Sequence, residues 1–138
     1  MPQQNPSKSF LVKQVLDPAS QTTVQHSEEI DCQGYENALL IVTVGAMASN
    51  STLDVATNES DTEEGTPAVV TGAAFTQILA ATGASKVYVG ELLLKARKRW
   101  LQFDFTPAVG AVVFGAVLVL SRGKYLPVTQ DNAVEFAV

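Results

Sequence analysis

The sequence predicts an all-β fold, a two-sheet antiparallel sandwich that is jelly-roll-like and has about eight strands. β-Branched and aromatic residues come in short runs, and clusters of Gly, Pro, Asn, Asp and Ser interrupt them at short intervals. This rhythm is typical of short strands joined by turns. No stretch keeps a helical period over three turns, and only residues 91–99 leave room for a short helix. Eight strands in one domain favour two packed sheets, for which the jelly roll is a common arrangement.

Taken in order along the chain, the predicted strands are 10–16, 22–30 (interrupted), 38–44, 52–58, 75–79, 86–94, 99–105 and 111–121. The clearest breaks are 45–51, 60–67, 81–85 and 106–110, where turn-forming residues gather.

Alternation indicates how individual strands lie. In 52–58, Leu53 and Val55 alternate with polar residues, so one face of this strand is expected to be wet. In 39–44 and 112–120 the odd and the even positions are both apolar. Both faces of each of these strands are therefore expected to be covered by other parts of the protein or by a partner. Gly115, inside the second run, predicts a bulge or a close backbone approach. Two doubly apolar strands favour an oligomer or a docking surface, and the alternative is that long loops fold over one sheet.

In strand 99–105, parity places Leu101, Phe103 and Phe105 on one face and Trp100 on the wetter side. These three apolar side chains are therefore predicted to face the core.

Composition restricts the class of protein. The chain has 138 residues, enough for one domain, and 46% hydrophobic against 17% charged residues argues against disorder. We predict a flexible N-terminal arm over 1–9, a sandwich domain over 10–128, and a C-terminal tail or extra strand over 129–138. The formal net charge of −5 predicts no direct nucleic-acid or membrane partner. The apolar run at 107–120 is too short for a membrane-spanning helix, which needs about 20 residues.

Residues 1–9 are polar and do not read as a signal peptide. The single cysteine, Cys32, cannot form an internal disulfide, and a lone thiol fits a reducing cytosol.

Few residues suggest chemistry. A dyad of His26 and Cys32 is conceivable, but a surface histidine and a small buried thiol are the favoured interpretation. One His and one Cys cannot complete a tetrahedral zinc site. Five acidic residues form the best metal candidate, although they lack the calcium-loop order and are expected to be a solvated turn: Asp54, Glu59, Asp61, Glu63 and Glu64. We therefore expect no enzyme activity, no cofactor, and no catalytic, cofactor-binding or metal residues.

The most distinctive feature is a basic segment that holds four of the nine cationic residues and is followed by Trp100: Lys95, Arg97, Lys98 and Arg99. The rest of the chain has a net charge of −9, the total of −5 less these four positive charges, which argues against nucleic-acid binding. A solvated loop is one alternative, and a patch matched to an acidic partner protein is another. A tryptophan beside arginines is typical of an interface anchor, so these five residues are candidate capsid or oligomer contacts.

The C-terminal segment 133–138 is apolar at five of six positions. It is predicted to be an additional strand of its own sandwich or a strand lent to a neighbour's sheet edge. Val134 and Phe136 share one face of this segment and would be the anchors, which makes them candidate contacts as well.

Several short motifs resemble those of the small head decoration, or cement, proteins of tailed bacteriophages. They are IDCQGYENA at 30–38, TLDV at 52–55 with ESD at 59–61, TGAAFTQ at 71–77, YVG at 88–90, RWL at 99–101 and KYLPV at 124–128. The resemblance spans about residues 28–128, and the similar proteins are cement proteins of short-tailed phages such as those that infect Bordetella. These motifs are typical of strands and turns, and they give no indication of catalysis.

The resemblance implies a non-enzymatic virion structural protein that binds the outer surface of an icosahedral phage head and ties neighbouring major capsid protein subunits together. It implies two partners, the major capsid protein and further copies of the chain in a dimer or trimer. It also implies synthesis in the bacterial host cytoplasm and a final place on the outer capsid surface. A phage tail or fibre subunit and a carbohydrate-binding β-sandwich module remain the alternatives.

Overall fold

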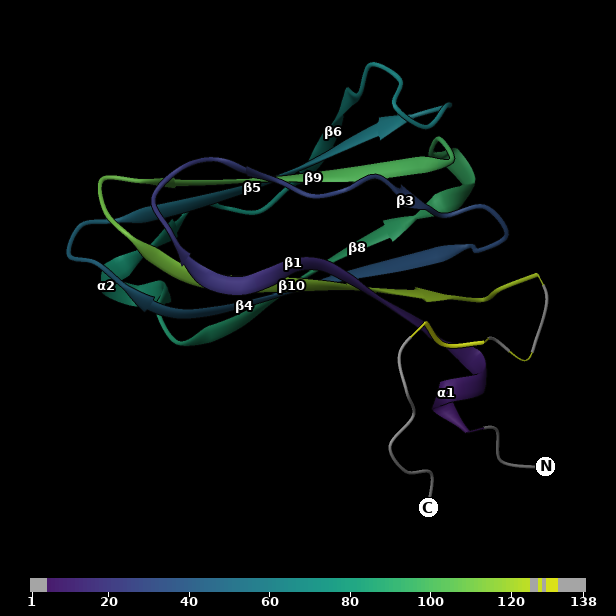
Figure 1. Ribbon diagram of the computed structural model, residues 1–138, viewed down its shortest axis with the longest axis horizontal. Coiled ribbons are helices and arrows are strands. Elements are labelled where there is room, and N and C mark those ends of the chain that lie inside the picture. The colour runs from purple at the N-terminus through teal and green to yellow at the C-terminus, as the bar shows by residue number, and fades with distance from the viewer. Residues whose placement is uncertain (1–4, 125–126, 128, 132–138) are drawn as a thin grey trace.

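Two antiparallel sheets pack face to face in the computed structural model, which describes residues 5–124, 127 and 129–131 (Figure 1). The first sheet, sheet A, has the strand order β1-β10-β4-β8, with β1 (Leu11–Gln21), β10 (Val112–Ser121), β4 (Asn37–Met47) and β8 (Lys86–Leu93). The second, sheet B, has the order β2-β9-β5-β6, with β2 (Gln25–His26), β9 (Trp100–Ala108), β5 (Thr52–Ser60) and β6 (Ala68–Ala74). Within sheet B, β3 (Ile30–Asp31) also pairs with β9 and β7 (Ile78–Leu79) with β5.

The predicted two-sheet antiparallel sandwich is confirmed, with ten strands in place of about eight. The difference lies in β3 and β7, which have two residues each. Without them, the remaining eight strands follow the orders first-eighth-third-sixth and second-seventh-fourth-fifth. This is the strand arrangement of a jelly roll.

Among the described residues, helical structure is confined to three short pieces: α1 (Pro6–Ser9), α2 (Ala80–Gly83) and the 3₁₀ turn η1 (Leu94–Ala96). The predicted N-terminal arm thus contains one helical turn. The turn η1 falls in the one range that left room for a short helix, whereas α1 and α2 lie outside it, so that restriction was wrong. Within the described ranges, no helix is long and apolar enough to cross a membrane.

The predicted strand at 75–79 is wrong apart from its last two residues, which form β7. Strand β6 lies earlier, at Ala68–Ala74, because backbone pairing with β5 extends a segment whose Gly72 and alanines have low strand propensity. Strand β1 also runs past Pro18 to Gln21, since Pro18 lies on a sheet edge and two shifts of register accommodate it. Strands β4 and β9 likewise extend into the predicted breaks at 45–51 and 106–110.

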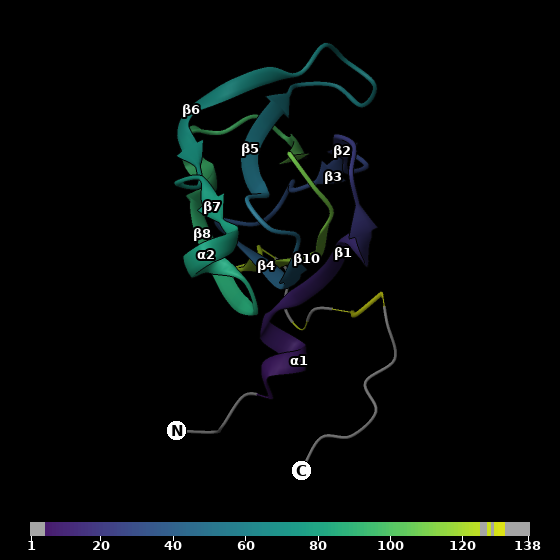
Figure 2. The same ribbon diagram turned by 90° about the vertical axis from the view of Figure 1, so that its left-hand side faces the viewer.

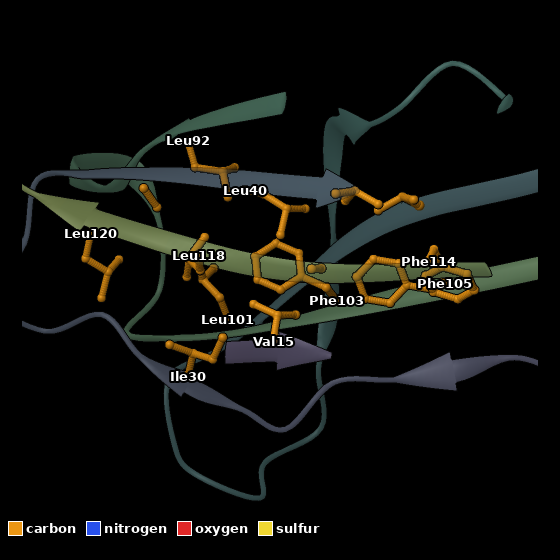
Figure 3. Packing of buried hydrophobic residues seen from close by; sticks show 14 of the residues in the cluster. Val15, Ile30, Leu40, Leu92, Leu101, Phe103, Phe105, Phe114, Leu118 and Leu120 are labelled. Carbon is orange, nitrogen blue, oxygen red and sulfur yellow. The ribbon is translucent and has the colours of Figure 1, made fainter. Parts of the chain in front are cut away.

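The core lies between the sheets (Figure 3). As parity predicted, Leu101, Phe103 and Phe105 of β9 all point inward and are fully buried. Phe105 meets Phe114 of β10 from the opposite sheet, with ring centroids 5.5 Å apart. Contacts of this kind hold the two layers together through burial of apolar surface.

Residues in and just before β1 form hydrogen bonds and an ion pair with residues 130 and 131. The Val12 N–H donates to Gln130 Oε1 at 3.1 Å, and Gln130 Nε2 donates to the carbonyl oxygens of Ser7, at 2.9 Å, and Phe10. Lys13 Nζ lies 2.6 Å from an Asp131 carboxylate oxygen. These contacts occupy part of the outer edge of β1.

Candidate interaction surfaces

The basic segment lies at one end of the sandwich, where β5 ends and β9 begins. Strand register brings this end together, because Trp100 of β9 is opposite both Ser60 of β5 and Asp31 of β3. Carboxylates distant in sequence therefore face the cations. We call the resulting group the charged end: Asp31, Glu59, Asp61, Lys95, Arg97, Lys98 and Arg99.

Arg99 makes the best-formed ion pair of the charged end. Its Nε and Nη2 donate to the two carboxylate oxygens of Asp31 at 2.9 and 2.8 Å. The hydrogen bond from Arg99 lowers the pKa of Asp31, and the same bond raises the pKa of Arg99. The bidentate geometry fixes the orientation of the guanidinium group at the surface.

Two more cations are paired within the chain. Arg97 Nη1 lies 3.5 Å from Glu59 Oε1, and Lys98 Nζ lies 3.7 Å from Asp61 Oδ2. The Lys98 backbone N–H also donates to Glu59 Oε2 at 3.0 Å. Lys95 is exposed and has no ion-pair partner among the described residues. Four cations and three carboxylates leave the charged end with one net positive charge, so it is a mixed surface more than a basic one.

Trp100 lies beside the charged end on the outer face of sheet B and is half-buried. The Arg99 guanidinium carbon lies over its ring, 5.1 Å from the ring centroid. This cation–π contact holds the indole in place next to the ion pairs. The structure thus brings all five sequence-predicted residues of segment 95–100 into one area, whereas Val134 and Phe136 lie outside the described residues.

The outer face of sheet B is polar. Asp104 of β9 is at its centre and accepts hydrogen bonds from two strands: His26 Nδ1 lies 2.5 Å from Asp104 Oδ1, and Asn58 Nδ2 donates to Oδ2 at 2.6 Å. Farther along β5, Gln77 Nε2 donates to Asp54 Oδ2 at 3.0 Å. Polar side chains on this face are thus bonded to one another across the strands.

The outer face of sheet A is largely apolar, although Gln14, Asn37 and Thr43 lie in the same rows. Register places eight aliphatic side chains side by side across its four strands, a group that we call the apolar face: Val12, Leu39, Ile41, Val87, Val89, Leu93, Val117 and Val119. Val87, Val89 and Leu93 on β8 are 62%, 62% and 67% exposed. Glu91 is the one charged residue in these rows. Among the described residues, no loop covers these exposed side chains on the β8 side.

His26 and Cys32 contact different parts of β9. His26 pairs with Asp104, whereas the Cys32 N–H donates to the Arg99 carbonyl at 2.9 Å. Cys32 is 5% exposed, and burial raises the pKa of its thiol to about 12. A thiol with this pKa stays protonated near neutral pH and is a poor nucleophile.

The acidic residues of the metal candidate are engaged separately. Asp54 bonds Gln77, while Glu59 and Asp61 face the cations of segment 97–98. In the part of the chain that the structure describes, no three His, Cys, Asp or Glu side chains converge as metal ligands.

No family model and no curated protein matches the sequence. Among solved structures, the PBSX exported protein XepA superimposes with a TM-score of 0.61 at 14% identity, over 99% of this chain and 45% of the XepA chain. This chain therefore spans less than half of that protein. The SPBc2 prophage-derived protein YomS has a TM-score of 0.49 at 13% identity, over 80% of this chain and 92% of its own. At this identity the likeness to XepA shows the fold alone.

A third match among solved structures is the Clostridium thermocellum xylanase 10B with its CBM22-1 and GH10 modules. It has a TM-score of 0.46 at 16% identity, over 91% of this chain and 28% of that chain.

Proposed function

We propose that the chain is a virion structural protein that binds the outer surface of an icosahedral phage head and ties neighbouring major capsid protein subunits together. The observation that carries the proposal is the apolar face of sheet A. Contiguous apolar surface of this kind, exposed on a soluble domain, marks a protein-binding surface. The motif resemblance to head decoration proteins supports a capsid partner, and the prophage origin printed for YomS agrees with a phage setting.

The proposed mechanism is mechanical and needs no catalysis. A domain that spans a joint between capsid subunits adds its own contacts to those that must break before the shell opens. Such docking needs an interface of about 800 Å² on each side, repeated at every site. A flat sheet face suits this requirement because it offers its side chains together to another flat surface.

In this proposal the charged end sets orientation. Lys95 lies in η1, directly after β8 of sheet A, and is exposed beside the ion pairs of Arg97 and Lys98. Charges at the margin of an apolar contact change the rate and specificity of docking more than its affinity.

Cryo-electron microscopy of the parent virion tests the proposal directly. We expect the sandwich on the outside of the head, at joints between capsid subunits, with sheet A towards the shell. Heads assembled without the protein should release DNA at a lower temperature than complete heads. Density on the tail or fibres would contradict the proposal in favour of a tail or fibre subunit, and equally heat-stable heads would reduce the role to decoration.

A carbohydrate-binding module is the second candidate, favoured by Trp100 among polar side chains on the outer face of sheet B. Stacking of a sugar on an aromatic ring quenches or shifts its fluorescence, and Trp100 is the single tryptophan. A glycan array followed by fluorescence titration of the hits therefore tests this candidate. Hits that Trp100→Ala abolishes would support it.

A further inference from the structure

Sheet edges differ in how well they are protected. An edge strand presents unpaired backbone groups, and proteins block such edges with bulges, prolines, short strands or covering segments. On β1, two register shifts, Pro18 and the Gln130 side chain on the Val12 N–H all disturb the edge. At one edge of sheet B, β2 and β3 are two residues long.

The other edge of sheet B is also irregular. Strand β6 has a register shift against β5, between Ala56 and Asn58, and Gly72 has a positive φ of 84°. Both features disturb the row of backbone groups that a new strand would need. These three edges are therefore poor templates for pairing.

Strand β8 is different. Its eight residues pair with β4 without any shift of register, and the strand contains no proline and no bulge. Among the described residues, β8 has no second strand neighbour and no backbone bond on its far side. A cleft of about 230 Å³ lined by residues 72–75 and 89–92 lies between it and β6. In Figure 2, β8 accordingly lies at the margin of sheet A.

Regular alternation decides which groups of β8 face outward. The Leu94 N–H donates to the Glu36 carbonyl, on the β4 side, at 2.8 Å. Because backbone groups alternate in direction along a strand, the N–H and C=O groups of every second residue before Leu94 also face β4. The residues between them therefore turn their N–H and C=O groups away from the sheet: Val87, Val89, Glu91 and Leu93. Three of these four carry the most exposed aliphatic side chains of the apolar face.

We propose that β8 pairs antiparallel with β8 of a second copy, which joins two A sheets into one eight-stranded sheet. The row of alternating donors and acceptors is complementary to itself under a two-fold axis perpendicular to the sheet. The register that uses all four outward residues places Val87 opposite Leu93 of the second copy and Val89 opposite its Glu91. The aliphatic side chains thus meet across the junction, and the two apolar faces become continuous.

The second copy fits this edge better than an unrelated charged partner. Along the outward residues, Glu91 is the one ionised side chain, so the edge offers no charge pattern for a partner to match. Edge pairing of this length buries less than the roughly 1,200 Å² typical of stable complexes, so the dimer is expected at micromolar concentration. The inference does not depend on the function proposed above.

Two substitutions at one position test the proposal. Val89→Pro removes an outward N–H without removing a bond to β4, and proline is tolerated on strand edges. Val89→Thr keeps the N–H and the branched shape, so it is the matched control. Sedimentation velocity over micromolar concentrations should show wild type and Val89→Thr moving from the 14.7 kDa monomer to a dimer, with Val89→Pro remaining monomeric. Circular dichroism melting checks that Val89→Pro is folded.

A wild-type chain that stays monomeric throughout, or a folded Val89→Pro chain that dimerises like wild type, would overturn the proposal. If Val89→Pro does not fold, Glu91→Gln decides. In the proposed register the two Glu91 carboxylates are diagonal neighbours across the junction and repel each other. Glu91→Gln should therefore tighten the dimer and reduce its salt dependence, and an unchanged dissociation constant would count against the pairing.

Discussion

Gly115 of β10 lies against Pro18 of β1. A Cβ atom at this position would lie 2.9 Å from both Cα and Cβ of Pro18, and the backbone of Pro18 cannot easily move away. We expect Gly115→Ala to destabilise the fold by about 1–3 kcal/mol because of this overlap. Urea denaturation measures the loss.

Gly45→Ala is the matched control in the same sheet. Its new Cβ would lie 3.2 Å from a methyl carbon of Val113, a side chain that can adjust. The loss should be small, since reduced freedom of the unfolded chain offsets it by up to about 1 kcal/mol. Equal losses for both variants would contradict the special role of the Pro18 contact.

Cys32 provides a second prediction at the residue scale. Burial raises the pKa of its thiol from 9.0 to about 12, so the folded chain keeps the proton while the unfolded chain loses it above pH 9. The contribution of Cys32 is therefore fully present below pH 9 and is lost as pH rises towards 12, with a loss of roughly 1 kcal/mol by pH 10. Cys32→Ala should lack this part of the decline, measured by urea denaturation from pH 7 to 10.5.

The same burial controls reactivity. The native thiol should resist alkylation by iodoacetamide at pH 8 and react readily in denaturant. Fast alkylation of the native protein would mean that Cys32 is accessible, against its burial in the structure.

At the scale of elements, one face of β9 packs in the core and its other face makes polar contacts. Phe103→Ala removes a fully buried ring and should cost about 3–5 kcal/mol. The neighbouring Gln102→Ala changes the half-buried outer face and should cost less than about 1 kcal/mol. Thermal and urea unfolding of both variants measure the difference, and similar losses would contradict the assignment of faces.

Strands with strong alternation or dense branched residues were predictable from the sequence. Strands β4, β5, β8, β9 and β10 are all where the runs of Val, Leu, Ile and Phe indicated, and all but β8 bury most of those side chains. Strand β6 was missed because Gly72 and three alanines surround its few branched residues, and pairing with β5 extends the whole segment. Local sequence does not report a partner strand, so such an element needs the tertiary structure.

The candidate contacts show the same limit. The basic segment was visible in sequence, but its carboxylate partners were not, since Asp31 and Glu59 approach it only through the pairing of β3 and β5 with β9. The one available signal was the acidic run at 59–64, which lies near the end of a predicted strand. Which strand ends meet cannot be decided without the register.

At the scale of the whole molecule, Lys95 offers the cleanest test of the charged end. Reversing the charge of Arg97, Lys98 or Arg99 would break an ion pair within the chain. Lys95, in contrast, is exposed and has no ion pair among the described residues. Lys95→Glu should weaken attachment to empty heads, more at low than at high salt, with an unchanged melting temperature. Head binding followed by sedimentation measures this.

Lys8→Glu is the control, because Lys8 is an exposed lysine outside both the charged end and sheet A, on α1. Its reversal should leave attachment to heads nearly unchanged. If Lys95→Glu binds as well as wild type at low salt, the charged end is only a solvated surface.

The order of strands in sheet A also governs how the chain folds. Strand β10 lies between β1 and β4 in sheet A. This sheet is therefore complete only after β10, late in the sequence, has paired with β1 near its start. A nascent chain that has emerged from the ribosome only up to β9 still lacks β10, which pairs with β4 beside Leu40 and Val42. Pairing between segments so distant in sequence is slow, in the millisecond-to-second range. Until synthesis reaches β10, the exposed edges of β1 and β4 are therefore open to aggregation, and expression at low temperature or with a chaperone should raise the yield of folded protein.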